Sequence, residues 1–200
     1  MVRREEQPWQ ARATLVLDNR LPAHRGQGAA SSLEAAVSAA ASIAVHLTQR
    51  GYAVRLVTAT GEEAGAEWHS RDATINAAPL LESLAVLRAT PAPRFDSGWL
   101  ADPGQGSLMV AVLGAVEEAD APVLRRMRMH TSTAMALALD VQAWAPDSPA
   151  TLDGASVLGG YGWRAVELRP GSRLDAVWQE LGRLGTRQPT GPEQPEELVR

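Results

Sequence analysis

Apolar runs typical of buried strands alternate with helix-type segments along most of this chain. The first run is ARATLVLD (residues 11–18), a segment with helical spacing follows (31–50), and a second apolar run comes next (52–60). Strands that read as near-continuous apolar runs have both faces covered, as in parallel sheets. The alternation therefore predicts an α/β fold, in which a doubly wound, mostly parallel sheet lies between two layers of helices as a Rossmann-like three-layer sandwich.

The segment 31–50 carries the start and stop signals of a long helix. Ser31 is placed to cap its first turn, and Glu34, three residues later, completes the sequence pattern of a capping box. Gly51 suits the left-handed conformation that often follows a helix. Many alanines lie between these ends and give a surface that allows close approach. We therefore expect this helix to pack directly on the sheet.

One antiparallel strand is expected at an edge of the sheet. The segment GEEAG (61–65) has the composition of a turn, and AEWH (66–69) follows it as a short return strand. Together with the strand at 52–60, these residues would form a hairpin.

The second half of the chain continues the alternation. A helix is expected from Ala78, with Pro79 in its first turn. A loop rich in Pro and Gly (90–106) follows, and long loops in compact domains are often functional. The remaining predicted elements are a strand ending near Gly114, a helix from Glu118 with Pro122 in its first turns, a strand at 133–144, a short helix and loop at 148–162, a strand at 163–168 and a last helix at 171–185.

The chain has 200 residues, which suits one domain with a hydrophobic core. We assign residues 1–185 to this domain. Residues 186–200 are rich in Pro and Glu and are expected to be a disordered tail.

Composition argues against several classes of function. The net charge of −4 argues against a nucleic-acid footprint, which needs a basic face. The absence of cysteine removes thiolate nucleophiles, disulfides and cysteine-ligated zinc. No apolar run approaches the roughly 20 residues that span a bilayer, so membrane contact would need segments outside this chain. The start MVRREEQPW also lacks the apolar core of a signal peptide.

The loop that follows the first strand is the first place to look for a site, because ligands of doubly wound sheets bind at the carboxyl ends of the strands. Asp18 ends that strand, and Asn19 follows it. Their oxygens suit Mg²⁺, which wants several oxygen ligands. Arg20 brings a positive charge and Pro22 offers no ligand atom. The alternative is that Asp18 caps the loop or pairs with Arg20 or Arg25.

Two enzyme hypotheses have weaker patterns. The glycine-containing segment 24–31 precedes a helix but lacks the order of a phosphate-binding loop, so it is interpreted as a flexible loop before a capped helix. A hydrolase could use Asp18 and His24 with a loop serine, Ser97 or Ser107, although no G-x-S-x-G elbow is present. We therefore expect no enzyme, no catalytic residue and no cofactor.

The tryptophans divide by their place in the sequence. Those at 144, 163 and 178 lie on predicted elements and are expected in the core. Trp9 and Trp99 lie in irregular segments, where a large aromatic is either an interface anchor or packs over the edge of the sheet.

Several blocks of sequence occur in an order and spacing that together resemble a known family. They are MVRREEQPW, TLVLDNR, RGYAVRLVT, SLMVAVLGAVEEADAPVLRRMR and GWRAVELRPGSRLDAVWQEL. Over roughly residues 1–184 they look like the bacterial domain of unknown function 58 family. The resemblance implies a von Willebrand factor type A fold, a doubly wound sheet with an antiparallel edge strand.

That fold commonly carries a metal-ion-dependent adhesion site. Its D-x-S-x-S motif falls on Asp18, Arg20 and Pro22, so only the aspartate matches. Thr90 or Ser97 would stand in for a threonine of a middle loop. Gly114, with Leu113, occupies the position where a further aspartate is usual. The resemblance therefore implies a degenerate site without metal, and a Mg²⁺-dependent adhesion module is the alternative.

Family members usually carry two membrane-spanning helices before this domain and are often found beside MoxR-type AAA+ ATPases. The resemblance implies the cytoplasmic, protein-binding part of a membrane-anchored bacterial protein that works with such an ATPase in envelope or complex assembly. Partner binding is expected at a cationic, metal-free rim that suits an acidic or polar partner. Its residues are Asp18, Asn19, Arg20, His24, Arg25, Ser97 and Trp99.

Overall fold

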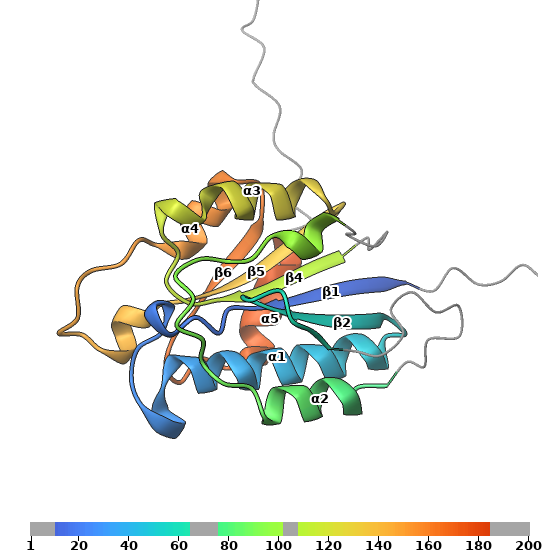
Figure 1. Ribbon diagram of the computed structural model, residues 1–200, viewed down its shortest axis with the longest axis horizontal. Helices are drawn as coiled ribbons and strands as arrows, with labels where there is room; N and C mark the ends of the chain where they lie inside the picture. The colour runs from blue at the N-terminus through green and yellow to red at the C-terminus, as the bar shows by residue number, and fades with distance from the viewer. Residues whose placement is uncertain (1–10, 65–75, 102–107, 185–200) are drawn as a thin grey trace, which may run out of the picture.

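The middle layer of the protein is a six-stranded sheet with the order β3-β2-β1-β4-β5-β6, seen in a computed structural model (Figure 1). The structure describes residues 11–64, 76–101 and 108–184. Neighbouring strands are parallel except β2 and β3, which are antiparallel. The predicted sheet, mostly parallel with one antiparallel edge strand, is therefore confirmed. The strands are β1 (Arg12–Leu17), β2 (Ala53–Thr58), β3 (Glu63–Ala64), β4 (Leu108–Leu113), β5 (Thr133–Leu139) and β6 (Arg164–Leu168).

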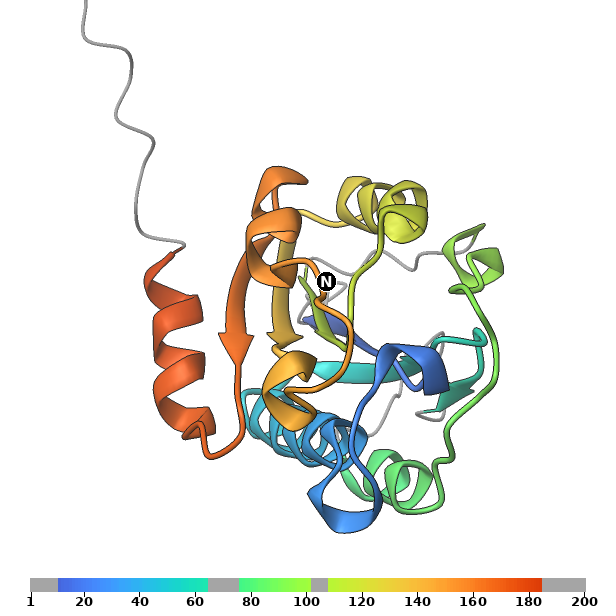
Figure 2. The same cartoon turned by 90° about the vertical axis from the view of Figure 1, so that its left-hand side faces the viewer.

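Helices cover both faces of this sheet. Figures 1 and 2 show α1 and α2 along one face and α3 and α4 along the other, and α5 shares a buried cluster with α1. Short 3-10 turns occupy several of the loops. The α-helices are α1 (Ser32–Gln49), α2 (Ala78–Ala85), α3 (Ala121–Met129), α4 (Gly154–Gly160) and α5 (Leu174–Arg183), and the turns are η1 (Leu21–Ala23), η2 (Gly28–Ala30), η3 (Gly98–Ala101), η4 (Glu118–Asp120) and η5 (Val141–Trp144).

The central strands divide their side chains between two cores. In β1, Leu15 and Leu17 belong to the cluster under α1, α2 and α5, whereas Val16 belongs to the cluster under α3 and α4. All three are completely buried. This is the arrangement expected when successive side chains of a strand point to opposite faces that are both covered.

Helix α1 packs on the sheet through small side chains. Ala36, Ala40 and Ala44 are completely buried at helical spacing, so the backbone lies close to the strands. Ser31 caps the helix as predicted, because its hydroxyl accepts from the Glu34 amide at 3.2 Å. The Ser31 amide, however, donates to the Gly28 carbonyl of η2, which takes the place of the second half of a capping box.

Two predicted strand boundaries are wrong. The return strand β3 lies at Glu63–Ala64, inside the segment interpreted as a turn, and residues 66–69 lie outside the described residues. Strand β5 ends at Leu139 rather than at residue 144. There the Asp140 carboxylate accepts from the Ala143 amide and begins the turn η5, so a side chain cap competes successfully with continuation of the strand.

Some sequence predictions concern parts of the chain that the structure does not describe. The tail at 186–200, Trp9 and Ser107 lie outside the described residues. Within the described ranges, no helix is both long and apolar enough to cross a membrane.

Candidate functional site

The order of the strands places one crevice at the centre of the sheet. The chain leaves β1 toward β2 on one side and enters β4 on the other, so the order reverses between β1 and β4. Ligands of open α/β sheets bind at such a switch point, beyond the carboxyl ends of the strands. Asp18 follows β1, and the loop after β4 leads through Gly114 to η4 and Asp120. These two loops form the candidate site.

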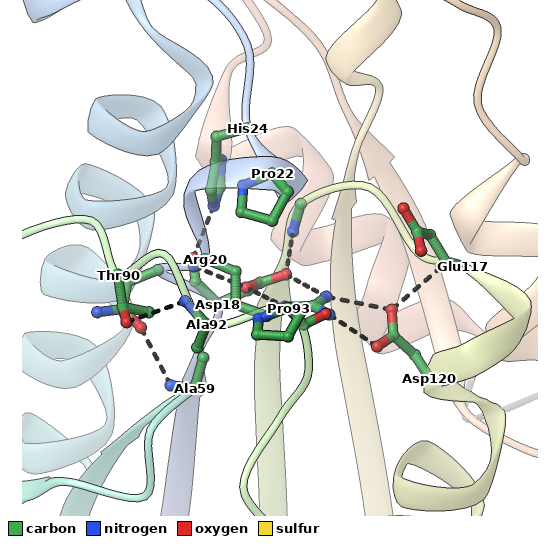
Figure 3. A network of polar contacts seen from close by, with 12 residues as sticks. Asp18, Arg20, Pro22, His24, Ala59, Thr90, Ala92, Pro93, Glu117 and Asp120 are labelled. Atoms are coloured by element: carbon green, nitrogen blue, oxygen red, sulfur yellow. Dashed lines mark hydrogen bonds and ion pairs between the residues drawn. The ribbon is translucent and has the colours of Figure 1, made fainter.

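A buried guanidinium joins the two loops (Figure 3). Arg20 donates from Nε to Asp18 Oδ1 at 2.9 Å and from Nη2 to Asp18 Oδ2 at 3.0 Å. It also donates from Nη1 to Asp120 Oδ1 at 2.7 Å and from Nη2 to Asp120 Oδ2 at 3.1 Å. Both contacts are bidentate, the geometry in which a guanidinium matches a carboxylate best. The Phe95 ring lies 4.1 Å from the guanidinium carbon.

Burial makes this network strong and leaves little of it at the surface. Asp18, Asp120 and Arg20 are 0%, 2% and 3% exposed. Desolvation alone would lower the pKa of Arg20, but its hydrogen bonds and charge interactions with the two carboxylates outweigh burial and raise that pKa above its ordinary value. The two carboxylates therefore favour the charged form of the guanidinium.

Both carboxylates also accept hydrogen bonds from backbone amides. Asp18 accepts from the Arg20 amide at 3.1 Å and from the Gly114 amide at 3.3 Å. Asp120 accepts from the Glu117 amide at 3.1 Å. The interpretation in which Asp18 pairs with Arg20 is confirmed.

Among the described residues, no group of three or more acidic, histidine or cysteine side chains is placed to hold a metal ion.

Two sequence expectations about this site are wrong. Arg20 does not make the rim cationic, because its guanidinium is buried between two carboxylates. The loop after β4 has not lost its carboxylate either, since Asp120 supplies one. One local pattern points to Asp120, because Glu117 and Asp120 have the spacing of reciprocal capping residues directly before the helix that contains Pro122.

Gly114 has a packing reason to be glycine. A Cβ atom at this position would run into the Ala23 carbonyl oxygen of η1. The same carbonyl accepts a hydrogen bond from the Ala115 amide at 2.8 Å. The absence of a side chain thus lets η1 lie directly against the end of β4, which brings Arg20 over the crevice.

His24 lies next to the network and has a defined tautomer. Its Nε2 is 2.7 Å from the Asp18 carbonyl oxygen, which can only accept, so Nε2 carries the proton. Nδ1 therefore accepts from the Ser32 hydroxyl at 3.0 Å, and the Ser32 oxygen accepts in turn from the Arg25 amide at 2.9 Å. Burial lowers the pKa of His24, although the Asp18 carboxylate opposes this shift. His24 is thus a neutral link between β1 and α1.

The hydroxyl beside His24 belongs to Ser32, which is neither of the serines named in the hydrolase hypothesis, Ser97 and Ser107. Ser32 is completely buried at the start of α1, so it has no exposed surface from which to attack a substrate. A serine at the first turn of a helix is ordinarily read as a cap, which is why this partner was not foreseen.

Asn19 joins the middle loop to the site. Its Nδ2 donates to the Arg88 carbonyl at 2.9 Å, and its Oδ1 accepts from the Ala59 amide at 3.1 Å. The Thr90 amide donates to the Asn19 carbonyl at 2.8 Å, which places Thr90 beside the cluster (Figure 3). The Thr90 hydroxyl accepts from the Ala92 amide at 3.3 Å. Asn19 is 4% exposed, and its hydrogen bonds hold these loops together.

The other predicted rim residues lie in different surroundings. Arg25 is half-buried, and its guanidinium donates to the carbonyls of Pro22 and His24. Trp99 is buried in the core under α3 and α4, where its indole donates to the Asp96 carbonyl at 3.0 Å. The Ser97 carbonyl accepts from Leu100 within the same turn. Packing, the alternative to an interface anchor, is the arrangement found for Trp99.

The class of protein that follows from this geometry is an α/β domain with a Rossmann-like sheet, compatible with a von Willebrand factor A-like fold. No family model and no curated protein matches the chain.

Proposed function

We propose that this chain is a non-catalytic protein-interaction domain of the von Willebrand factor A type, with an internal guanidinium in place of a metal ion. The sheet order, with one antiparallel edge strand, supports the type of fold. The sequence blocks around TLVLDNR and SLMVAVLGAV support membership of the domain of unknown function 58 family.

One observation carries the metal-free part of this proposal. The carboxylates at the switch point, Asp18 and Asp120, each face the same guanidinium in a bidentate contact. A divalent ion at this position would have to displace a cation that is covalently part of the loop. Mg²⁺ also dehydrates reluctantly, so the exchange is unfavourable.

The non-catalytic part rests on burial around His24. A nucleophile beside a base must reach its substrate, but Ser32, the hydroxyl paired with His24, is completely buried. This hydrogen bond links two parts of the backbone. It supports a structural role for the pair and argues against the hydrolase hypothesis.

The partner follows from the family resemblance. A domain of this kind would be the cytoplasmic part of a membrane-anchored bacterial protein and would bind a MoxR-type AAA+ ATPase in envelope or complex assembly. Specific binding of the purified chain to such an ATPase from the same genome, measured by sedimentation velocity, tests this assignment. Absence of a complex at micromolar concentrations would reject the ATPase as partner.

Calorimetric titration with Mg²⁺, Mn²⁺ and Ca²⁺ separates this proposal from a metal-dependent adhesion module. We expect no saturable heat up to millimolar metal, and the same melting temperature with and without a chelator. Arg20→Ser is the matched control, because it frees both carboxylates and should raise the affinity for Mn²⁺. Saturable binding to the natural chain that disappears in Asp18→Asn would overturn the proposal.

A further inference from the structure

Helix α3 has a positively charged outer face. Its sequence, APVLRRMRM, contains three arginines and no carboxylate. Leu124 and Met127 are completely buried against the sheet, which turns Arg125, Arg126 and Met129 outward. Figures 1 and 2 show α3 on the outside of its layer, and no other helix of the described residues lies over it.

The arginines of α3 differ in what they bind. Arg128 donates to the carbonyls of Gly162 and Thr131, at 2.8 and 2.9 Å, and so ties the helix to its neighbours. Neither Arg125 nor Arg126 has an ion pair to any residue within the described part of the chain. Both side chains are exposed. In a protein with a net charge of −4, this leaves a local excess of positive charge on one helix.

Met129 gives the same face an apolar centre. Its exposed fraction is 83%, the largest among the exposed large apolar residues of the described chain. It lies four residues after Arg125 and three after Arg126, so the three side chains are neighbours on the helix surface. Methionine, arginine and tyrosine are enriched at protein interfaces, and an exposed methionine adds little to the stability of the fold.

The position of Arg125 is partly fixed before any partner binds. Its guanidinium carbon lies 4.6 Å from the centre of the Tyr161 ring, a distance at which a cation and an aromatic face attract each other. Tyr161 follows α4 and is itself half-buried. A side chain held in this way loses less conformational entropy on binding than a free one.

We propose that Arg125, Arg126, Met129 and Tyr161, here named the α3 face, form a docking surface for an acidic segment of a partner protein. In this contact, carboxylates would pair with the two arginines and an apolar side chain would cover Met129. The inference rests on the proposed function, and it assigns the binding of an acidic partner to the α3 face and no longer to the rim. A membrane surface fits less well, since α3 offers Met129 alone where an interfacial helix needs a wide apolar face.

Fluorescence anisotropy tests this surface with a labelled synthetic peptide in which pairs of glutamates flank central leucines. The full chain should bind the peptide, and binding should weaken as salt is added. Arg125→Gln with Arg126→Gln should weaken it about tenfold, and Met129→Ser should weaken it severalfold. The control is Arg50→Gln with Arg94→Gln, which makes the same charge change at exposed sites elsewhere and should have little effect.

Several results would overturn the inference. They are absence of peptide binding, equal binding of a peptide with glutamine at every glutamate, and equal loss in the Arg50 and Arg94 control. Binding that appears only after removal of residues 186–200 would assign the surface to the chain's own C-terminal segment. Arginine-dependent binding to phosphatidylglycerol vesicles, without peptide binding, would assign it to a membrane.

The ATPase experiment distinguishes the two proposals. If the natural chain binds the ATPase and the Arg125 and Arg126 variant binds it equally well, the α3 face is wrong while the proposed function stands. If the ATPase does not bind but the peptide binds through the arginines, the named partner is wrong and the docking surface stands.

Discussion

Two groups of arginines in this molecule have opposite surroundings. Arg20 is 3% exposed and makes bidentate contacts with Asp18 and Asp120. Arg125 and Arg126 are exposed on α3. The guanidinium of Arg20 pairs with carboxylates inside the protein and so joins the loops after β1 and β4. The guanidinium groups of Arg125 and Arg126 face the solvent, where they are accessible to a binding partner.

The comparison shows that the position of a charged residue in a loop or a helix does not reveal its role. An arginine in a loop at the carboxyl edge of a sheet would ordinarily be taken for a ligand-binding residue, and arginines on a short helix for a solvated face. Here the loop arginine is structural, because two carboxylates that are distant in sequence meet it in space. The effect of removing each arginine should therefore differ widely.

The largest difference is expected for Arg20→Leu. Removing the guanidinium leaves Asp18 and Asp120 buried without a counter-ion, which should lower the free energy of unfolding by about 3–5 kcal/mol. Urea unfolding followed by circular dichroism measures this loss. The matched variant Arg126→Leu should change the free energy of unfolding by less than about 0.5 kcal/mol. Equal losses in the two variants would remove the basis of the comparison.

The next effect concerns the glycine that lets the Arg20 loop approach β4. Gly114→Ala should destabilise the protein by about 1–3 kcal/mol, because the new methyl group meets the backbone of Ala23. Gly159→Ala in α4 is the control. Apart from its own stretch of helix, its Cβ would meet no described atom within 4 Å, and alanine favours the helix by up to about 1 kcal/mol. Thermal unfolding should therefore move in opposite directions in these two variants.

A smaller effect is expected from acidification. Burial lowers the pKa of His24 below its ordinary value of 6.5, so the unfolded chain binds a proton more readily than the folded one. Stability gained from neutral His24 is present above pH 6.5 and falls as the pH drops toward the lowered pKa, by up to about 1.4 kcal/mol per pH unit.

Urea unfolding at several pH values isolates this contribution by comparison with His24→Gln, which does not titrate. The stability of the natural chain relative to this variant should decrease from pH 7 to pH 5. Asp18 and Arg20 should stay in place in His24→Gln, so a variant spectrum that matches the natural chain by circular dichroism is the control. A constant difference between the natural chain and His24→Gln at all pH values would disprove the assignment of a neutral imidazole.

The smallest effect separates the two arginines of α3. Arg125→Gln removes the contact with Tyr161 and should destabilise the protein by about 0.5–1 kcal/mol. Arg126→Gln removes no such contact with the described residues and should leave the free energy of unfolding unchanged within about 0.5 kcal/mol. Differential scanning calorimetry checks both variants. Equal effects would mean that the ring does not hold Arg125 in place.

Much of the fold was predictable because it rests on local patterns. The apolar runs of β1 and β4, the Ser31 cap and Gly51 after α1 are each read from neighbouring residues, and each is confirmed. The end of β5 was not predicted because the residues of the turn after Asp140, Val141–Trp144, are as apolar as those of a continuing strand. The edge strand Glu63–Ala64 was misplaced because two residues give no periodicity.

Less of the site was predictable because its contacts are long-range. The position of Asp18 at the carboxyl end of β1 followed from the alternation of strands and helices. The contact of Arg20 with Asp120, however, joins residues 100 positions apart, and no local pattern encodes it. The same holds for Asn19, whose amide reaches the carbonyl of Arg88, 69 positions away.

Because Arg20 bridges the two loops, the stability of the crevice should not depend on the concentration of free metal ions. A bound ion stabilises a protein according to its free concentration and its affinity, so a metal-bridged crevice loosens when the ion is withdrawn. A guanidinium attached to the backbone beside Asp18 has a fixed stoichiometry and a local concentration set by the chain itself. The loops after β1 and β4 should therefore keep the same spacing in metal-rich, metal-poor and chelator-treated solutions.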